Sequence, residues 1–165
     1  MTLGSRMFII LFLVTLALVT RSRAADEPVF VFPVDCVLGE TCIIQNFVDH
    51  DPSSSAKDYR CGAMTYDGHD GTDIRLRSLA EMRRGVNVLA AADGKVLRTR
   101  DGIPDQSIRA ADALSVDGRE CGYAAVIDHG DGYETQYCHM QRGSLRVKDG
   151  MTVKRGDIIG RVGLS

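Results

Sequence analysis

At residues 86–97 the chain reads VNVLAAADGKVL, a short apolar run, a glycine turn and a second short apolar run. A similar pattern returns at residues 151–163, which read MTVKRGDIIGRVG. Period-two alternation, β-branched residues and turn glycines predict short antiparallel strands through most of Val86–Val162. We therefore expect an all-β fold, an antiparallel β-sandwich or barrel of the duplicated hybrid motif type, with long loop insertions and at most one short helix.

A hairpin is predicted between these stretches, where residues 123–137 read YAAVIDHGDGYETQY. A two-residue turn at His129 and Gly130 would place Cys121 opposite Cys138. A four-residue turn over residues 129–132 would make these cysteines diagonal and a disulfide between them harder to form. His129 itself is interpreted as a turn residue in either arrangement.

The N-terminus is typical of a secretory signal peptide. Arg6 precedes an apolar run from Met7 to Val19, and small residues up to Ala24 suit a signal peptidase. The apolar run is shorter than the roughly 20 residues that a membrane-spanning helix needs. We therefore expect residues 1–24 to be a signal peptide, and the protein to be exported to the periplasm or the extracellular space without a stable membrane anchor after cleavage.

The charge balance argues against a nucleic-acid partner. Removal of residues 1–24 takes three arginines from 20 basic residues, which leaves 17 against 22 acidic residues and a formal charge of −5. The length that remains suits one domain with its own core. We divide it into residues 25–61, an N-terminal strand and disulfide-linked loop region, and residues 62–165, a β-core that is incomplete at its C-terminus.

Five cysteines in an exported chain indicate a disulfide framework with one cysteine left over. Cys36 and Cys42 are close enough to close a local loop, next to an edge strand expected over Val29–Val34. Cys61 has no evident partner. Either it is a buried thiol, or its partner lies beyond Ser165.

Three further segments connect the strands. Ser78–Arg84 is predicted to form one or two helical turns, with Ser78 as N-cap and Glu81 at the capping-box position. Asn46–Asp58 is expected to be an exposed loop, and its Asp-His-Asp triplet at residues 49–51 is interpreted as solvated. Arg98–Gly122 is expected to be a long surface insertion.

The sequence HDGTD at residues 69–73 offers the best candidate metal ligands. The imidazole of His69 and the carboxylate of Asp73 both suit zinc. Spacing alone is more typical of a surface turn, because His and Asp are common turn residues.

The order of motifs makes the pair more specific. Residues 66–74, YDGHDGTDI, resemble the G-H-x-G-x-D motif of the lysostaphin-like and LytM-like zinc metalloendopeptidases, which are peptidoglycan hydrolases. Residues 88–96, 122–140 and 147–163 resemble the next strand pair, the central hairpin and the closing glycine-rich segment of that family. The resemblance thus covers residues 66–165 in family order.

The resemblance implies a Zn²⁺ ion held by His69, Asp73 and the second histidine of a C-terminal H-x-H motif. It implies that His139 is the hairpin histidine that assists catalysis, with peptidoglycan as the partner and substrate. Strand alternation would place Tyr137 on the same face as His139, with Cys138 on the opposite face. Tyr137 then either lines the substrate-binding cleft or belongs to ordinary strand packing.

One departure from the family pattern is evident, because no H-x-H motif occurs in the 165 residues. Two ligands bind zinc less well than three, so we expect this chain to be inactive or impaired. We expect Ser165 to be a break in the gene rather than a natural terminus. The alternative is a degenerate, non-catalytic domain of the same fold that binds cell wall or activates another hydrolase.

Overall fold

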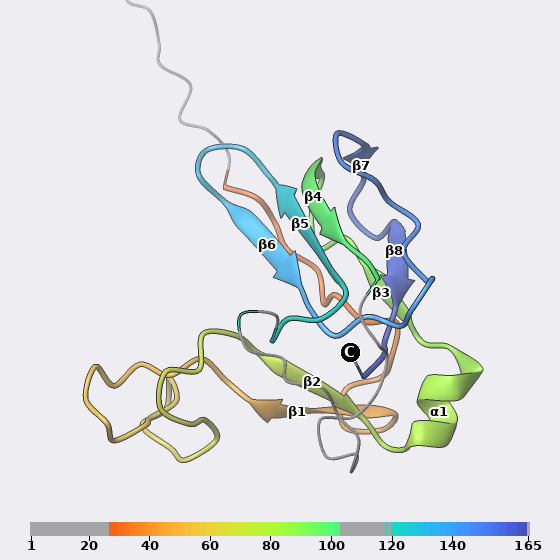
Figure 1. The fold of residues 1–165 in the computed structure, drawn as a ribbon. Coiled ribbons are helices and arrows are strands. Elements are labelled where there is room, and N and C mark those ends of the chain that lie inside the picture. The colour runs from red at the N-terminus through yellow and green to blue at the C-terminus, as the bar shows by residue number, and fades with distance from the viewer. Residues whose placement is uncertain (1–26, 103–117, 119, 165) are drawn as a thin grey trace, which may run out of the picture.

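The computed structural model describes residues 27–102, 118 and 120–164 (Figure 1). The expected signal peptide at residues 1–24 lies outside this range, as does most of the expected insertion. The elements, in chain order, are β1 (Cys42–Asn46), β2 (Asp73–Leu76), α1 (Leu79–Arg84), β3 (Asn87–Leu89), β4 (Gly94–Arg100), β5 (Ala124–Asp128), β6 (Glu134–Tyr137), β7 (Thr152–Val153) and β8 (Ile158–Arg161). The antiparallel all-β fold with one short helix is confirmed for these residues, and none of their helices is long and apolar enough to span a membrane.

The core lies against a four-stranded antiparallel sheet in the order β6-β5-β4-β7. β5 runs through its centre, and its residues Ala124–Ile127 are all buried, which explains their unbroken apolar sequence. Ile127 and Ile159 are fully buried, and burial of each such side chain stabilises the fold by roughly 1.5–3 kcal/mol. The cluster around them comprises Val88, Ala90, Ala91, Val96, Tyr123, Ala125, Tyr137, Met140, Val147 and Val153.

The two similar stretches pair with each other and not within themselves. β3 is antiparallel to β8, and β4 is antiparallel to β7. Between these pairs, Ala90 N–H donates to the Asp157 carbonyl and Gly156 N–H donates to the Ala90 carbonyl. The duplicated motif is therefore two strand-turn-strand units, and the strands of one unit pair with the strands of the other.

β1 and β2 form a separate antiparallel pair, and in Figure 1 they cross below the end of the large sheet where β6 terminates. α1 follows β2, and its predicted capping box is confirmed, because Ser78 Oγ accepts from Glu81 N–H and the Glu81 carboxylate accepts from Ser78 N–H. β1 lies before position 61 and β2 lies after it, and the two strands pair with each other. The domain boundary expected after residue 61 stays a prediction.

The expected strand over Val29–Val34 is only partly formed. It runs beside β3, where Val31 N–H donates to the Ala91 carbonyl and Leu89 N–H donates to the Pro33 carbonyl. Val34 makes a single bridge to Val88. Pro33 has no N–H to donate, so a continuous ladder cannot form there.

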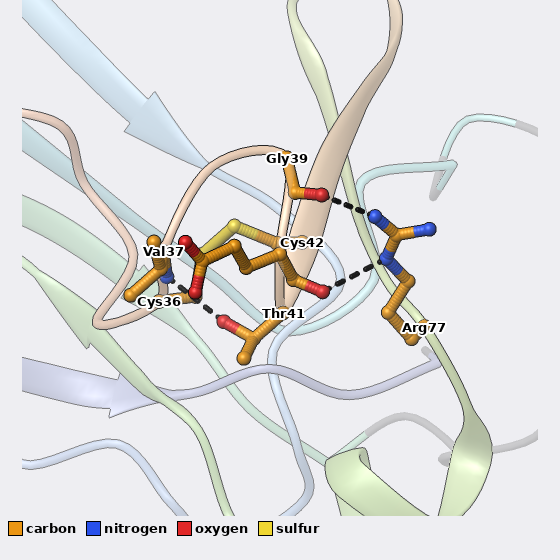
Figure 2. Close-up of a disulfide and its surroundings, with 7 residues drawn as sticks. Cys36, Val37, Gly39, Thr41, Cys42 and Arg77 are labelled. Carbon is orange, nitrogen blue, oxygen red and sulfur yellow. Dashed lines mark hydrogen bonds between the residues drawn. A yellow bond between two sulfur atoms is a disulfide. The ribbon is translucent and has the colours of Figure 1, made fainter.

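The local disulfide between Cys36 and Cys42 is confirmed (Figure 2). Arg77 closes over its loop, because Nε donates to the Glu40 carbonyl at 3.0 Å and Nη2 donates to the Gly39 carbonyl. Cys61 is free and exposed, so the buried-thiol interpretation was wrong.

Both turns considered for the central hairpin were wrong. Ala125 pairs with Tyr137 and Asp128 with Glu134, which leaves a five-residue loop over His129–Tyr133. Asp131 lies in the left-handed region with φ 52°, a conformation that a simple two-residue count does not foresee. The disulfide between Cys121 and Cys138 nevertheless forms, with 4.6 Å between the Cα atoms.

Two other expectations change in detail. β4 continues to Arg100, so the insertion expected at Arg98–Gly122 begins later, and its residues 103–117 and 119 lie outside the described range. β6 ends at Tyr137, and His139 has φ 56°, which interrupts the strand alternation. Tyr137 is buried and His139 is exposed. The expectation that the two residues share a face was therefore wrong.

Candidate functional site

His69 is held in a loop that leads into β2. Its N–H donates to the Tyr66 carbonyl at 3.0 Å, and its own carbonyl accepts from Asp49 N–H at 2.7 Å. The rings of Tyr66 and His69 lie 4.3 Å apart between centroids. His69 is therefore only 8% exposed, although it lies in a polar loop.

Asp73 is the first residue of β2 and faces His69. Oδ1 of Asp73 lies 3.6 Å from Nε2 of His69, which is too far for a hydrogen bond. The other carboxylate oxygen, Oδ2, accepts from Nδ2 of Asn46 at 2.8 Å. One oxygen of the carboxylate is thus fixed by Asn46, and the other is directed at the imidazole.

The geometry of this pair fits zinc. Nε2 of His69 is buried and has no hydrogen-bond partner among the residues that the structure describes, which is costly unless something else binds it. Two ligands of a tetrahedral zinc ion lie about 3.3–3.6 Å apart, because each bond is roughly 2.0–2.2 Å long. Within the described ranges, however, no group of three His, Cys, Asp or Glu side chains forms a metal cluster. The structure therefore assembles two ligands of a candidate zinc site.

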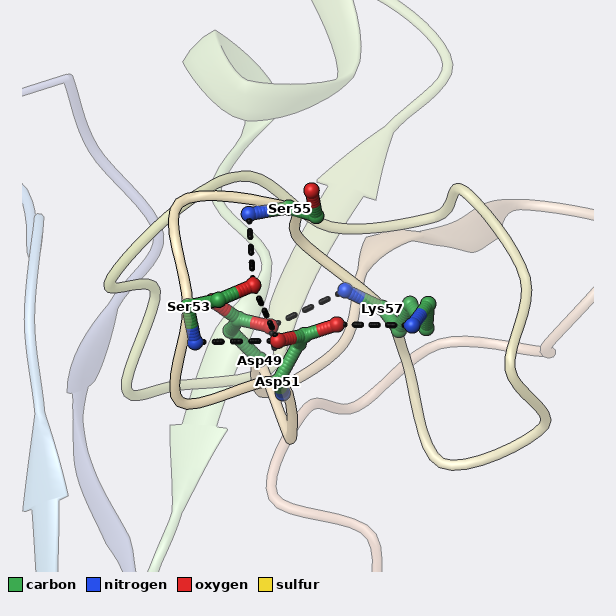
Figure 3. A network of polar contacts seen from close by, with 5 residues as sticks. All are labelled: Asp49, Asp51, Ser53, Ser55 and Lys57. Atoms are coloured by element: carbon green, nitrogen blue, oxygen red, sulfur yellow. Dashed lines mark hydrogen bonds and ion pairs between the residues drawn. The ribbon is translucent and has the colours of Figure 1, made fainter.

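The preceding loop is organised by Asp49 (Figure 3). Its Oδ1 accepts from the N–H groups of Asp51 and Lys57, each at 3.0 Å, and its Oδ2 accepts from Gly68 N–H at 3.1 Å. These backbone donors hold the pKa of Asp49 below its ordinary value. Asp51 pairs with Lys57 at 2.8 Å. The Asp-His-Asp triplet at residues 49–51 thus serves loop structure, but it is not solvated throughout as expected, because the Asp51 side chain is only 11% exposed. Asp49 ties that loop to the segment that carries His69.

His139 is placed by a different part of the fold, the segment that follows β6. In Figure 1, β6 points toward the side of the molecule on which β1 and β2 lie. The His139 side chain is exposed, and its backbone N–H donates to the Cys121 carbonyl at 2.9 Å. Histidine is the side chain that most often serves as a general acid or base, and the exposed position leaves His139 accessible.

Tyr137 lies in the core. It is 7% exposed, and its hydroxyl accepts from Ala91 N–H at 2.8 Å. Oγ1 of Thr135 lies 2.9 Å from the same hydroxyl and 2.7 Å from Nε2 of His129. These contacts favour the packing interpretation of Tyr137, and its role in substrate binding stays a prediction.

Sequence reasoning missed two residues that shape the pair. Asn46 comes from β1, 27 residues before Asp73, and only the pairing of β1 with β2 brings them together. Tyr66 covers the His69 ring, and partial burial together with the nearby carboxylates of Asp73 and Asp70 raises the pKa of the Tyr66 hydroxyl. The only available signal was the proximity of Tyr66 to His69 in the sequence.

A comparison with known protein families identifies the family that this chain matches. The model of peptidase family M23 matches residues 67–165, a range that contains His69, Asp73, Tyr137 and His139. No curated protein matches the chain. The matched range is more than half of the sequence and confirms the resemblance to the lysostaphin-like and LytM-like peptidases. The chain therefore belongs to peptidase family M23.

Proposed function

We propose that the protein is an exported zinc metalloendopeptidase that hydrolyses peptide bonds in bacterial peptidoglycan. The observation that carries the proposal is the buried, unbonded Nε2 of His69 opposite Oδ1 of Asp73. Membership in a peptidase family gives the reaction class. The apolar N-terminal run and the cell-wall specificity of the relatives that the motifs resemble support export and the choice of substrate.

The residues of this chain would divide the work as follows. His69 and Asp73 would hold the metal, with Asn46 fixing the orientation of the carboxylate. A zinc ion bound there would supply Lewis-acid chemistry. His139 would move a proton or donate a hydrogen bond to the oxyanion through its exposed imidazole.

A second candidate is a non-catalytic domain that binds cell wall or activates another hydrolase. It is favoured by one observation, the lack of a three-ligand cluster among the residues that the structure describes. A pair of ligands alone holds zinc weakly, because each missing bond lowers the affinity. This candidate predicts binding to peptidoglycan without release of muropeptides.

The test uses the full chain. Bound zinc is measured by atomic absorption, and muropeptide release from purified peptidoglycan is measured by chromatography. We expect His69→Ala to lose both, and the matched variant His50→Ala, at an exposed loop position, to keep both. Release that is unchanged in His69→Ala would overturn the peptidase proposal, and binding without release in the unmodified protein would establish the second candidate.

A further inference from the structure

We propose that the disulfide between Cys121 and Cys138 positions His139 for catalysis, a role that the disulfide between Cys36 and Cys42 does not share. The inference rests on the proposed function, since it concerns the same reaction. It makes Cys121 and Cys138 positioning residues that act through the segment of backbone carrying His139.

The first support is the anchoring of His139 on the Cys121 side. His139 follows Cys138 directly, and its N–H donates to the Cys121 carbonyl at 2.9 Å. One residue further on, Met140 N–H donates to the Tyr123 carbonyl at 3.2 Å. The covalent bond and two backbone hydrogen bonds thus tie residues 138–140 to residues 121–123.

The second support is the backbone conformation of His139. Its φ of 56° lies in the left-handed region, which residues other than glycine rarely adopt. Such a conformation persists only where the surrounding structure imposes it. The disulfide holds the preceding residue, Cys138, and the Cys121 carbonyl holds the N–H of His139, so both restrain this conformation from one side.

The third support is a set of backbone contacts between the His139 segment and residues 161–163, on the side away from Cys121. Gly163 N–H donates to the His139 carbonyl at 2.9 Å, and Gln141 N–H donates to the Arg161 carbonyl at 2.8 Å. The backbone of Gly163 approaches Met140 and Gln141 so closely that a Cβ atom would not fit. His139 therefore sits between two fixed segments, of which only the Cys121 side is secured covalently.

The other disulfide provides the matched control. Cys36 and Cys42 are six residues apart and close a loop of the N-terminal region, whereas Cys121 and Cys138 are 17 apart and join both arms of the hairpin. Loss of either bond costs stability. Only loss of the Cys121–Cys138 disulfide removes the covalent bond that holds the segment carrying His139.

The experiment compares Cys121→Ser/Cys138→Ser with Cys36→Ser/Cys42→Ser by NMR in the full chain. Removal of Cys121–Cys138 is expected to lower the backbone order parameter of His139 from about 0.85 to below about 0.6, while Asp128 and Gln136 in the same hairpin stay rigid. The control pair is expected to leave His139 unchanged. An unchanged order parameter for His139 in a folded Cys121→Ser/Cys138→Ser variant overturns the proposal.

If that variant does not fold, hydrogen exchange in the unmodified chain decides. The amide of His139 is expected to be protected to the same degree as that of Met140, since the same segment holds both. Exchange of the His139 amide at the rate of an unstructured peptide, beside a protected Met140 amide, contradicts the proposal.

Catalysis provides a separate measurement. In the full chain, loss of Cys121–Cys138 is expected to lower kcat for muropeptide release about 10²-fold with KM unchanged, because a misplaced catalytic group weakens the chemical step. A kcat equal to that of the control variant would overturn the proposal. The unmodified protein could fail to release muropeptides while its disulfide still keeps His139 rigid. That result would contradict the proposed function but not the effect of the disulfide on His139.

Discussion

Nε2 of His69 and Oδ1 of Asp73 lie 3.6 Å apart, with the imidazole buried and the carboxylate 37% exposed. The separation is too long for a hydrogen bond, so the two groups do not satisfy each other. Because the second carboxylate oxygen is bonded to Asn46, the arrangement presents one nitrogen and one oxygen to a shared ligand. A borderline metal ion is the ligand that suits both donors.

The first prediction concerns Asp73 itself. Asp73→Ala is expected to reduce bound zinc to background, because only one of the two assembled ligands then remains. Zinc binding is measured by competition with a fluorescent chelator. Asp70→Ala, at an exposed neighbouring position, is the control. Equal losses in the two variants would show that loop charge, and not the His69–Asp73 pair, attracts the metal.

The second prediction concerns Asn46. Asn46→Ala removes the donor to Asp73 Oδ2, so the carboxylate is free to rotate, and zinc affinity is expected to fall about 10–100-fold. The control is Gln45→Ala, since Gln45 is exposed on the same strand. Thermal unfolding of the metal-free proteins separates a loss of fold from a loss of affinity. An Asn46→Ala protein with normal zinc affinity would mean that Asp73 is oriented without its help.

The sequence predicted features that depend on neighbouring residues. Ser78 and Glu81 are three residues apart and form the capping box by themselves, and Cys36 reaches Cys42 across a short loop. Strand alternation likewise predicted the antiparallel class, because it records which side chains a strand buries.

Features that depend on distant residues were not predicted. Nothing in residues 86–97 indicates that β3 pairs with β8 and not with β4, because periodicity does not name a partner strand. The contact of Asn46 with Asp73 was not predicted for the same reason, because it depends on the pairing of β1 with β2. The left-handed conformations of Asp131 and His139 also carry no reliable sequence signal, so the turn length and the face of His139 were wrong.

The third prediction decides between the two interpretations of Tyr137. Tyr137→Phe leaves the buried Ala91 N–H without its acceptor, which is expected to destabilise the protein by about 1–3 kcal/mol. If Tyr137 only packs, KM for muropeptide release stays unchanged. The free energy of unfolding is measured in urea, with Tyr133→Phe as control because Tyr133 is more exposed. A rise in KM without a loss of stability would assign Tyr137 to the substrate.

The fourth prediction concerns stability at acidic pH. Asp58 is 5% exposed, and its carboxylate accepts from the N–H groups of Gly62, Arg60 and Met64. These bonds, the one from Gly62 foremost, lower the pKa of Asp58 in the folded protein. A lowered pKa means that the folded state favours the ionised form. The resulting stability is fully present above the unfolded pKa of about 3.9, and it is lost as the pH falls through the folded value.

Asp58→Asn removes this contribution, because one carboxylate oxygen is replaced by an amide nitrogen, which cannot accept a hydrogen bond from a backbone N–H. We expect the variant to unfold at a lower urea concentration than the unmodified protein at pH 7, and the difference to shrink as the pH falls below about 3.9. Asp67→Asn, at an exposed position in the same loop region, is the control. A difference between Asp58→Asn and the unmodified protein that stays constant from pH 7 to acidic pH would show that ionisation of Asp58 does not stabilise the fold.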